Sequence, residues 1–139
     1  IKTLPLRMEQ HQKNAFAIAK WLQEQPRVQY VLYPGLENHP GYEINKAQTT
    51  GFGGMISFAV DNAETARQIL EGVKLIKFAE SLGGTESLIT YPIRQTHTDL
   101  TAEECAEKGI TDCLLRFSTG IEATQDLIDD LAQAFAAVE

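Results

Sequence analysis

The 139-residue sequence has few cysteines, few basic residues and no long hydrophobic run, and each shortage excludes a class of protein. Its two cysteines, Cys105 and Cys113, form no Cys-x-x-Cys pair, which favours reduced thiols in a cytoplasmic protein over a disulfide framework. Twelve basic against 19 acidic residues give a net charge of −7, which argues against a nucleic acid or an anionic membrane surface as a partner. No apolar run approaches the roughly 20 residues that cross a bilayer.

Motifs for metal binding or catalysis are also missing. The three histidines, His11, His39 and His97, are scattered, and no metal-ligand spacing relates them to one another or to the cysteines. The sequence holds no Gly-x-Ser-x-Gly elbow. The glycine cluster at residues 51–54 precedes a strand pattern, so it lacks the helix start that binds phosphate, and a bend or bulge is the better interpretation. The residues alone therefore predict no metal site and no catalytic group.

The residues that are present indicate one globular domain covering residues 1–139, with 43% hydrophobic and 22% charged side chains. Apolar periodicity predicts helices over residues 3–25, 61–71, 101–109 and 127–138, with one further helical turn near 42–47. It predicts strands over residues 28–33, 55–60, 75–78, 87–91 and 113–118. Because these elements mix without a strict βαβ period, the expected fold class is α+β. We expect a two-layer domain in which helices cover one face of a mostly antiparallel sheet.

Local signals predict where the helices begin and which face is solvated. Asp61 and Thr101 are each followed three residues later by glutamate, which is the form of a capping box. The last helix carries a clear apolar stripe. Its solvated face is expected to hold three acidic residues, Asp126, Asp129 and Asp130.

Two strand-like segments hold groups that a hydrophobic core would not select. One contains Glu80 and Ser81, and the other contains Arg116 inside an otherwise apolar run. A guanidinium group keeps its proton, so it requires a carboxylate or water. A hydroxyl, a carboxylate and a guanidinium together suit a small zwitterion such as an amino acid. The alternative is a structural ion pair, in which Glu86 or Asp112 takes the guanidinium.

These segments, with others along the chain, resemble the carboxyl-terminal region of the cysteine/methionine-metabolism family of pyridoxal-phosphate enzymes, which includes cystathionine γ-synthase and cystathionine γ-lyase. The resemblance covers essentially the whole chain. The segments that carry it are Leu4-Pro5-Leu6-Arg7-Met8-Glu9, Pro34-Gly35-Leu36, Gly51-Phe52-Gly53-Gly54-Met55, Glu80-Ser81-Leu82-Gly83-Gly84, Thr96-His97, Leu115-Arg116-x-Ser118-x-Gly120-Ile121-Glu122 and Asp126-Leu127-Ile128.

The resemblance implies a fold and a set of site residues. The fold would be the small carboxyl-terminal domain of an aspartate-aminotransferase-type (fold type I) enzyme. Arg116 would bind the α-carboxylate of the amino-acid substrate, helped by Ser81, and Glu80 would lie near the distal amino group of cystathionine. Leu82 and Thr96 would line the same pocket.

The resemblance also implies what the chain lacks. The Schiff-base lysine, the phosphate-binding residues and the aromatic ring that stacks on the cofactor belong to a larger upstream domain. No lysine of this chain lies in a matching segment, so pyridoxal 5′-phosphate is expected only in the full-length parent, a homo-oligomer. The chain begins at Ile1 without methionine and is expected to be an inactive piece of that parent. The alternatives are a stand-alone binding domain with the same fold, or a parent of the cystathionine β-lyase or O-acylhomoserine sulfhydrylase type.

Overall fold

The computed structural model describes residues 1–95 and 100–139, which form helices and strands mixed along the chain. Within this described part, no helix combines the length and the apolar character that crossing a bilayer requires. The helices are α1 (Leu4–Gln23), α2 (Tyr42–Gln48), α3 (Ala63–Gly72), α4 (Pro92–Gln95), α5 (Ala102–Glu107) and α6 (Thr124–Ala136). The strands are β1 (Val28–Leu32), β2 (Met55–Val60), β3 (Lys77–Phe78), β4 (Leu88–Thr90) and β5 (Leu114–Ser118).

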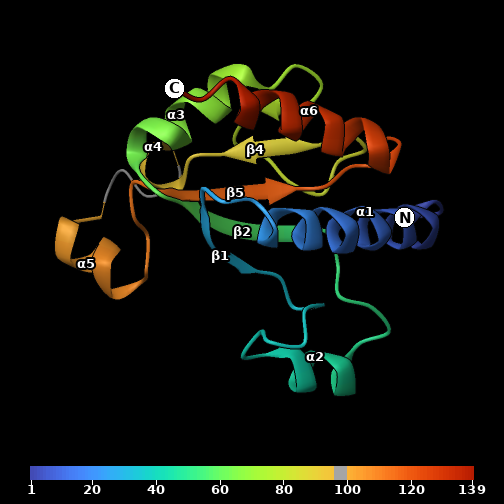
Figure 1. The fold of residues 1–139 in the computed structure, drawn as a ribbon. Coiled ribbons are helices and arrows are strands. Elements are labelled where there is room, and N and C mark those ends of the chain that lie inside the picture. The colour runs from blue at the N-terminus through green and yellow to red at the C-terminus, as the bar shows by residue number, and fades with distance from the viewer. Residues whose placement is uncertain (96–99) are drawn as a thin grey trace.

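The five strands form a single sheet in the order β1-β2-β5-β4-β3. All neighbouring pairs are antiparallel except β3 and β4, which are parallel. Helices α1, α3 and α6 lie over one side of this sheet, while α2 lies below it and α5 lies beyond the left ends of β4 and β5 (Figure 1). The predicted α+β architecture, with a mostly antiparallel sheet covered on one face, is confirmed.

The hydrophobic core lies between the sheet and its helices. Ile56 and Phe58 of β2 and Leu115 and Phe117 of β5 are fully buried and pack with the apolar faces of α1, α3 and α6. Burying a side chain of this size stabilises the fold by roughly 1.5–3 kcal/mol. Because successive strand residues point to opposite faces, the residues between these four face away from the helices. That alternation places Arg116 on the uncovered face of the sheet.

Two of the predicted helix starts have different outcomes. Thr101 forms the predicted capping box with Glu104 at the start of α5. At α3 the prediction is wrong, because Asn62, one residue after Asp61, is the cap, and its side chain accepts a hydrogen bond from the Thr65 N–H group at 2.9 Å. The neighbouring glutamate, which the capping box would have used, pairs instead with an arginine on the outside of α3.

The prediction that Asp130 is solvated is also wrong. The residue is 7% exposed, and its carboxylate accepts hydrogen bonds from the backbone N–H groups of Lys74, Leu75 and Ile76 at 2.8, 2.9 and 2.8 Å. The chain passes this side of α6 as it leaves α3 for β3, which encloses the carboxylate. The other two aspartates of the predicted face are exposed. Asp130 is therefore a structural residue that holds the chain leading into β3.

Candidate functional site

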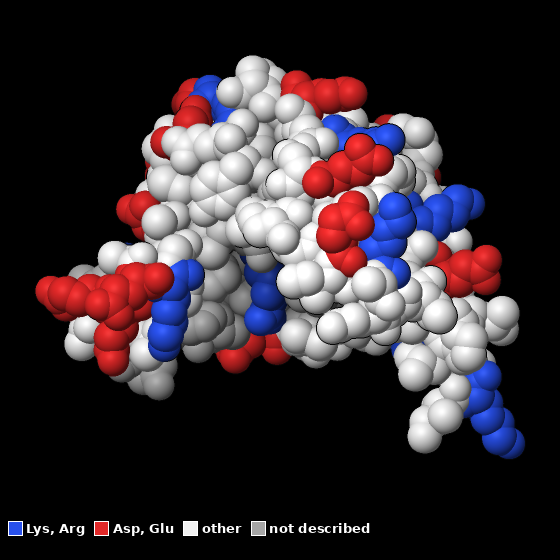
Figure 2. All heavy atoms as spheres, turned by 90° about the horizontal axis from the view of Figure 1, so that it is seen from below, with Lys and Arg blue, Asp and Glu red and all other residues white. Residues whose placement is uncertain are grey.

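Arg116 lies on β5, between β2 and β4. Its register partners are Ser57 on β2 and Thr90 on β4. Since directly opposed residues of antiparallel strands share a face, these three polar residues form a row on the side of the sheet away from the helix layer. Figure 2 shows the molecule from below, where the surface is hollowed at its centre and a basic side chain is visible inside the hollow.

The guanidinium of Arg116 has few internal partners. Its Nη2 group donates to the hydroxyl of Thr90 at 3.3 Å. Its Nε atom is buried and has no hydrogen-bond partner among the described residues. Within residues 1–95 and 100–139, Arg116 takes part in no ion pair. The guanidinium has five N–H donors and a fixed positive charge, so it can still bind an anion. A carboxylate matches its geometry best.

The two carboxylates that could have neutralised Arg116 make other contacts. Glu86 is exposed and accepts a hydrogen bond from the hydroxyl of Thr85 at 3.3 Å. Asp112 accepts from the thiol of Cys113 at 3.3 Å. Burial raises the pKa of Cys113, with the hydrogen bond to Asp112 adding to the shift, so the thiol keeps its proton. The structural ion pair is therefore absent from the described part of the chain.

The segment that carries Ser81 is held at both ends by residues of the same sheet. Before it, the hydroxyl of Thr90 donates to the carbonyl of Ala79 at 2.9 Å. After it, the N–H group of Gly83 donates to the hydroxyl of Ser118 at 2.9 Å. Thr90 lies opposite the arginine and Ser118 lies two residues beyond it on the same strand and face. The short exposed segment between these anchors is thus held at both ends by residues that lie on the same face of the sheet as Arg116.

A close backbone approach supports this arrangement. Gly120 follows β5, and a Cβ atom at this position would come within 2.6 Å of the backbone carbonyl carbon of Glu86. The N–H group of Ile121 donates to the carbonyl of Thr85 at 2.9 Å. The absence of a side chain at Gly120 therefore lets the end of the Ser81 loop lie against the chain leaving β5.

The predicted site residues fall into two groups. Glu80, Ser81 and Leu82 lie on the anchored segment and are exposed, and the Ser81 hydroxyl has no partner among the described residues. Thr96, and also His97, lie outside the described residues, so their predicted place in the pocket stays a prediction. The structure thus brings the Ser81 segment and the arginine to one region of the sheet.

Sequence reasoning missed Thr90, Ser57 and Ser118. Ser118 could have been found, because the period of two in a strand puts it on the same face as Arg116. Thr90 and Ser57 lie opposite Arg116 only because β4 and β2 both pair with β5, a strand order that was not predicted from the sequence.

The structure also tests the other titratable groups. Within the described residues, no group of three or more His, Cys, Asp or Glu side chains could hold a metal ion. His11 is buried on α1, and its Nδ1 atom bonds to the carbonyl of Thr119, which makes it a structural residue. Both cysteines are free thiols.

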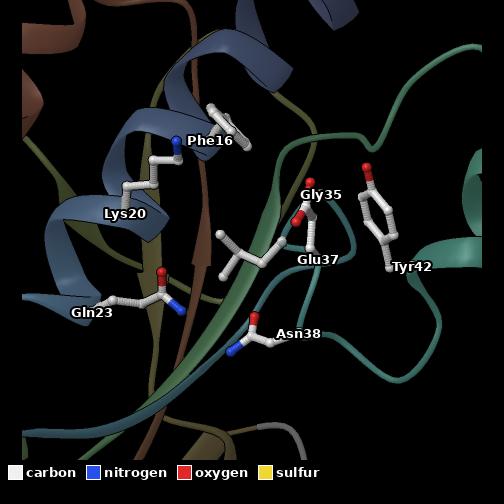
Figure 3. Close-up of a pocket in the computed structure, with 8 residues that line it drawn as sticks. Phe16, Lys20, Gln23, Gly35, Glu37, Asn38 and Tyr42 are labelled. Carbon is white, nitrogen blue, oxygen red and sulfur yellow. The ribbon is translucent and has the colours of Figure 1, made fainter.

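A separate hollow of about 440 Å³ lies between α1 and residues 35–42. Figure 3 shows Lys20 reaching over the ring of Phe16, and the ammonium nitrogen is 4.5 Å from the ring centroid. This hollow contains none of the predicted site residues, so it is distinct from the region around Arg116. Its lining consists of Phe16, Lys20, Gln23, Gly35, Leu36, Glu37, Asn38 and Tyr42.

Residues 1–136 match the sequence profile of the Cys/Met metabolism PLP-dependent enzymes. The chain therefore belongs to this family. It is 52% identical to a cystathionine gamma-lyase of Dictyostelium discoideum, a match that covers 96% of this chain and 35% of that protein. It is 51% identical to a cystathionine gamma-synthase of Haemophilus influenzae, over 98% of this chain and 32% of that protein.

A solved structure, that of cystathionine gamma-lyase from Lactobacillus plantarum complexed with L-serine, has the same fold. The TM-score is 0.94 at 41% identity, and the match covers 99% of this chain and 36% of that one. The chain spans about a third of the length of the relatives it matches.

The family implies pyridoxal phosphate, and the lysines of this chain test whether the chain could hold it. A lysine that forms a Schiff base is activated by desolvation or by a neighbouring cation. All seven lysines here are exposed, so none has the desolvated setting. The lysines of this chain therefore offer no desolvated amine for the Schiff base of the cofactor.

Proposed function

We propose that this chain is the carboxyl-terminal, substrate-binding domain of a pyridoxal-phosphate-dependent trans-sulfuration enzyme of the cystathionine γ-lyase or γ-synthase type. The observation that carries the proposal is the Arg116 guanidinium, which has no carboxylate partner in the described chain and an unpartnered Nε–H group. Membership of the family and the names of the relatives support it.

In this function the chain binds and orients the substrate. Arg116 binds the α-carboxylate by donating two parallel N–H···O bonds, and the free hydroxyl of Ser81 donates to the same carboxylate. Glu80, exposed on the same segment, receives the distal ammonium group of cystathionine. Holding both ends of the amino acid removes its rotational freedom relative to the reacting atoms, which is a large contribution to catalysis. The cofactor, its lysine and the oligomer contacts belong to the remaining length of the enzyme.

A comparison of two arginines in the full-length protein tests the proposal. Arg116→Gln removes the cation that grips the carboxylate, and Arg27→Gln removes a surface arginine that pairs with Asp61 at 3.3 Å. Losing two hydrogen bonds between charged groups is expected to raise KM for L-cystathionine by about 100-fold. Arg27→Gln should leave KM unchanged. A near-normal KM for Arg116→Gln would refute the carboxylate assignment.

The same assay tests Glu80. Glu80→Gln should raise KM for L-cystathionine and leave KM unchanged for an amino-acid substrate that has no distal amino group. An equal effect on both substrates would remove Glu80 from the site.

The cytoplasmic location also remains a proposal. The two free thiols support it, and cell fractionation can test it.

A further inference from the structure

Thr90 links the two halves of the proposed carboxylate site. The residue is buried, with 1% of its surface exposed, and it lies directly opposite Arg116 in the register of β4 and β5. Its hydroxyl accepts a hydrogen bond from Nη2 of Arg116 at 3.3 Å and donates one to the carbonyl of Ala79 at 2.9 Å. Glu80 and Ser81 directly follow Ala79 in the sequence.

The direction of these bonds is fixed by the chemistry of the hydroxyl. Thr90 has one O–H proton, and the carbonyl of Ala79 can only accept it. The lone pairs of the same oxygen are then left for Arg116, which can only donate. Because the residue is buried, solvent water does not compete for the oxygen. The chain of bonds therefore has a single polarity, and each bond strengthens the other.

The far end of this chain of bonds is also fixed. The N–H group of Ala79 donates to the carbonyl of Ile89 at 3.1 Å. The backbone N–H and C=O groups of Ala79 are therefore both bonded to residues of β4. The Ser81 segment therefore starts from a backbone that is tied to the strand beside Arg116. A shift of either part is transmitted to the other through one side chain.

We propose that Thr90 is a positioning residue that holds the Arg116 guanidinium and the Ser81 segment at one fixed separation, so that both reach the same α-carboxylate. This inference rests on the proposed function. Thr90 does not touch the substrate. It acts by keeping the guanidinium fork aligned before the substrate arrives.

The test uses the full-length protein with L-cystathionine as substrate. Thr90→Val removes both hydrogen bonds with little change in volume, Thr90→Ala removes them with a smaller side chain, and Thr90→Ser restores the hydroxyl. The matched control is Thr65→Val, because Thr65 is also 1% exposed and accepts from a different arginine, Arg27, at 3.4 Å.

We expect Thr90→Val and Thr90→Ala to raise KM by about tenfold, the effect of one hydrogen bond to a charged group, with kcat within about threefold of wild type. Thr90→Ser should restore KM to within about threefold of wild type, and Thr65→Val should leave KM unchanged. A crystal structure of Thr90→Val should show the Arg116 guanidinium displaced.

Three outcomes would overturn the inference: an unchanged KM in Thr90→Val and Thr90→Ala, a failure of Thr90→Ser to recover, or a KM in Thr65→Val raised as much as in Thr90→Val. Arg116→Gln separates this failure from that of the proposed function. If Arg116→Gln has a raised KM while Thr90→Val does not, only the role of Thr90 is wrong. If Arg116→Gln binds normally, the carboxylate site itself is wrong.

Discussion

The buried carboxylate of Asp130 should make a large contribution to the stability of the fold. Asp130→Ala removes the acceptor of three backbone N–H groups, those of residues 74–76. Ile76 is 1% exposed, so its N–H group would lose its partner without gaining water, which costs about 1–3 kcal/mol. Lys74 and Leu75 are exposed and can recover water, so each of these bonds contributes less, roughly 0.5–1 kcal/mol.

The expected total is a loss of about 3 kcal/mol in the free energy of unfolding, against roughly 5–15 kcal/mol for a whole domain. Asp130→Asn should lower the free energy of unfolding by less than Asp130→Ala. One carboxylate oxygen accepts from both Leu75 and Ile76, and an amide oxygen in its place keeps those two bonds. The amide NH₂ group would then face the N–H group of Lys74 and the side-chain amide of Gln133, so a loss of about 1 kcal/mol is expected.

Urea unfolding followed by circular dichroism measures these differences, provided that the slope of unfolding free energy against urea concentration is the same in each variant. The matched control is Asp129→Ala, since Asp129 is the preceding residue on α6, is exposed and, among the described residues, accepts a hydrogen bond only from the side chain of Gln125. It should change stability by less than about 0.5 kcal/mol. Hydrogen exchange at the amides of residues 74–76 should accelerate in Asp130→Ala. Equal stability of Asp130→Ala and Asp129→Ala would refute the reasoning.

Two further predictions concern a close approach and a buried phenol. Gly120→Ala should lower the free energy of unfolding by about 1–3 kcal/mol, because the added Cβ would press on the backbone of Glu86. In the same urea assay Gly41→Ala should leave the free energy of unfolding unchanged, because its added Cβ would lie at ordinary contact distances. Burial raises the pKa of Tyr33 from 10.0 to about 12, and its hydroxyl donates to the carbonyl of Gly53. The folded state therefore holds this proton more tightly, so stability should fall as the pH rises from about 10 to about 12, and Tyr33→Phe should lack this component. A Tyr33→Phe protein with the same alkaline profile as wild type would contradict it.

Much of the architecture followed from local patterns. The apolar runs at residues 55–60 and 113–118 predicted two strands, which form β2 and β5, and the apolar stripe of α6 predicted the face on which Leu127 and Leu131 are buried. Each of the two cap predictions depends on a single side chain, and one of them is wrong. Thr101 behaves as predicted, whereas Asn62 replaces Asp61 because either oxygen-bearing residue can accept from the first turn of α3.

The sequence by itself determined that a permanent cation lies within an apolar strand, because the charge of an arginine does not depend on its surroundings. Only the tertiary structure decided that Arg116 has no carboxylate partner among the described residues, that Thr90 lies opposite it, and that Asp130 is enclosed. Each of these depends on which strand or loop packs alongside. Residues far apart in the chain make those contacts, which depend on strand pairing and tertiary packing as well as on the local pattern.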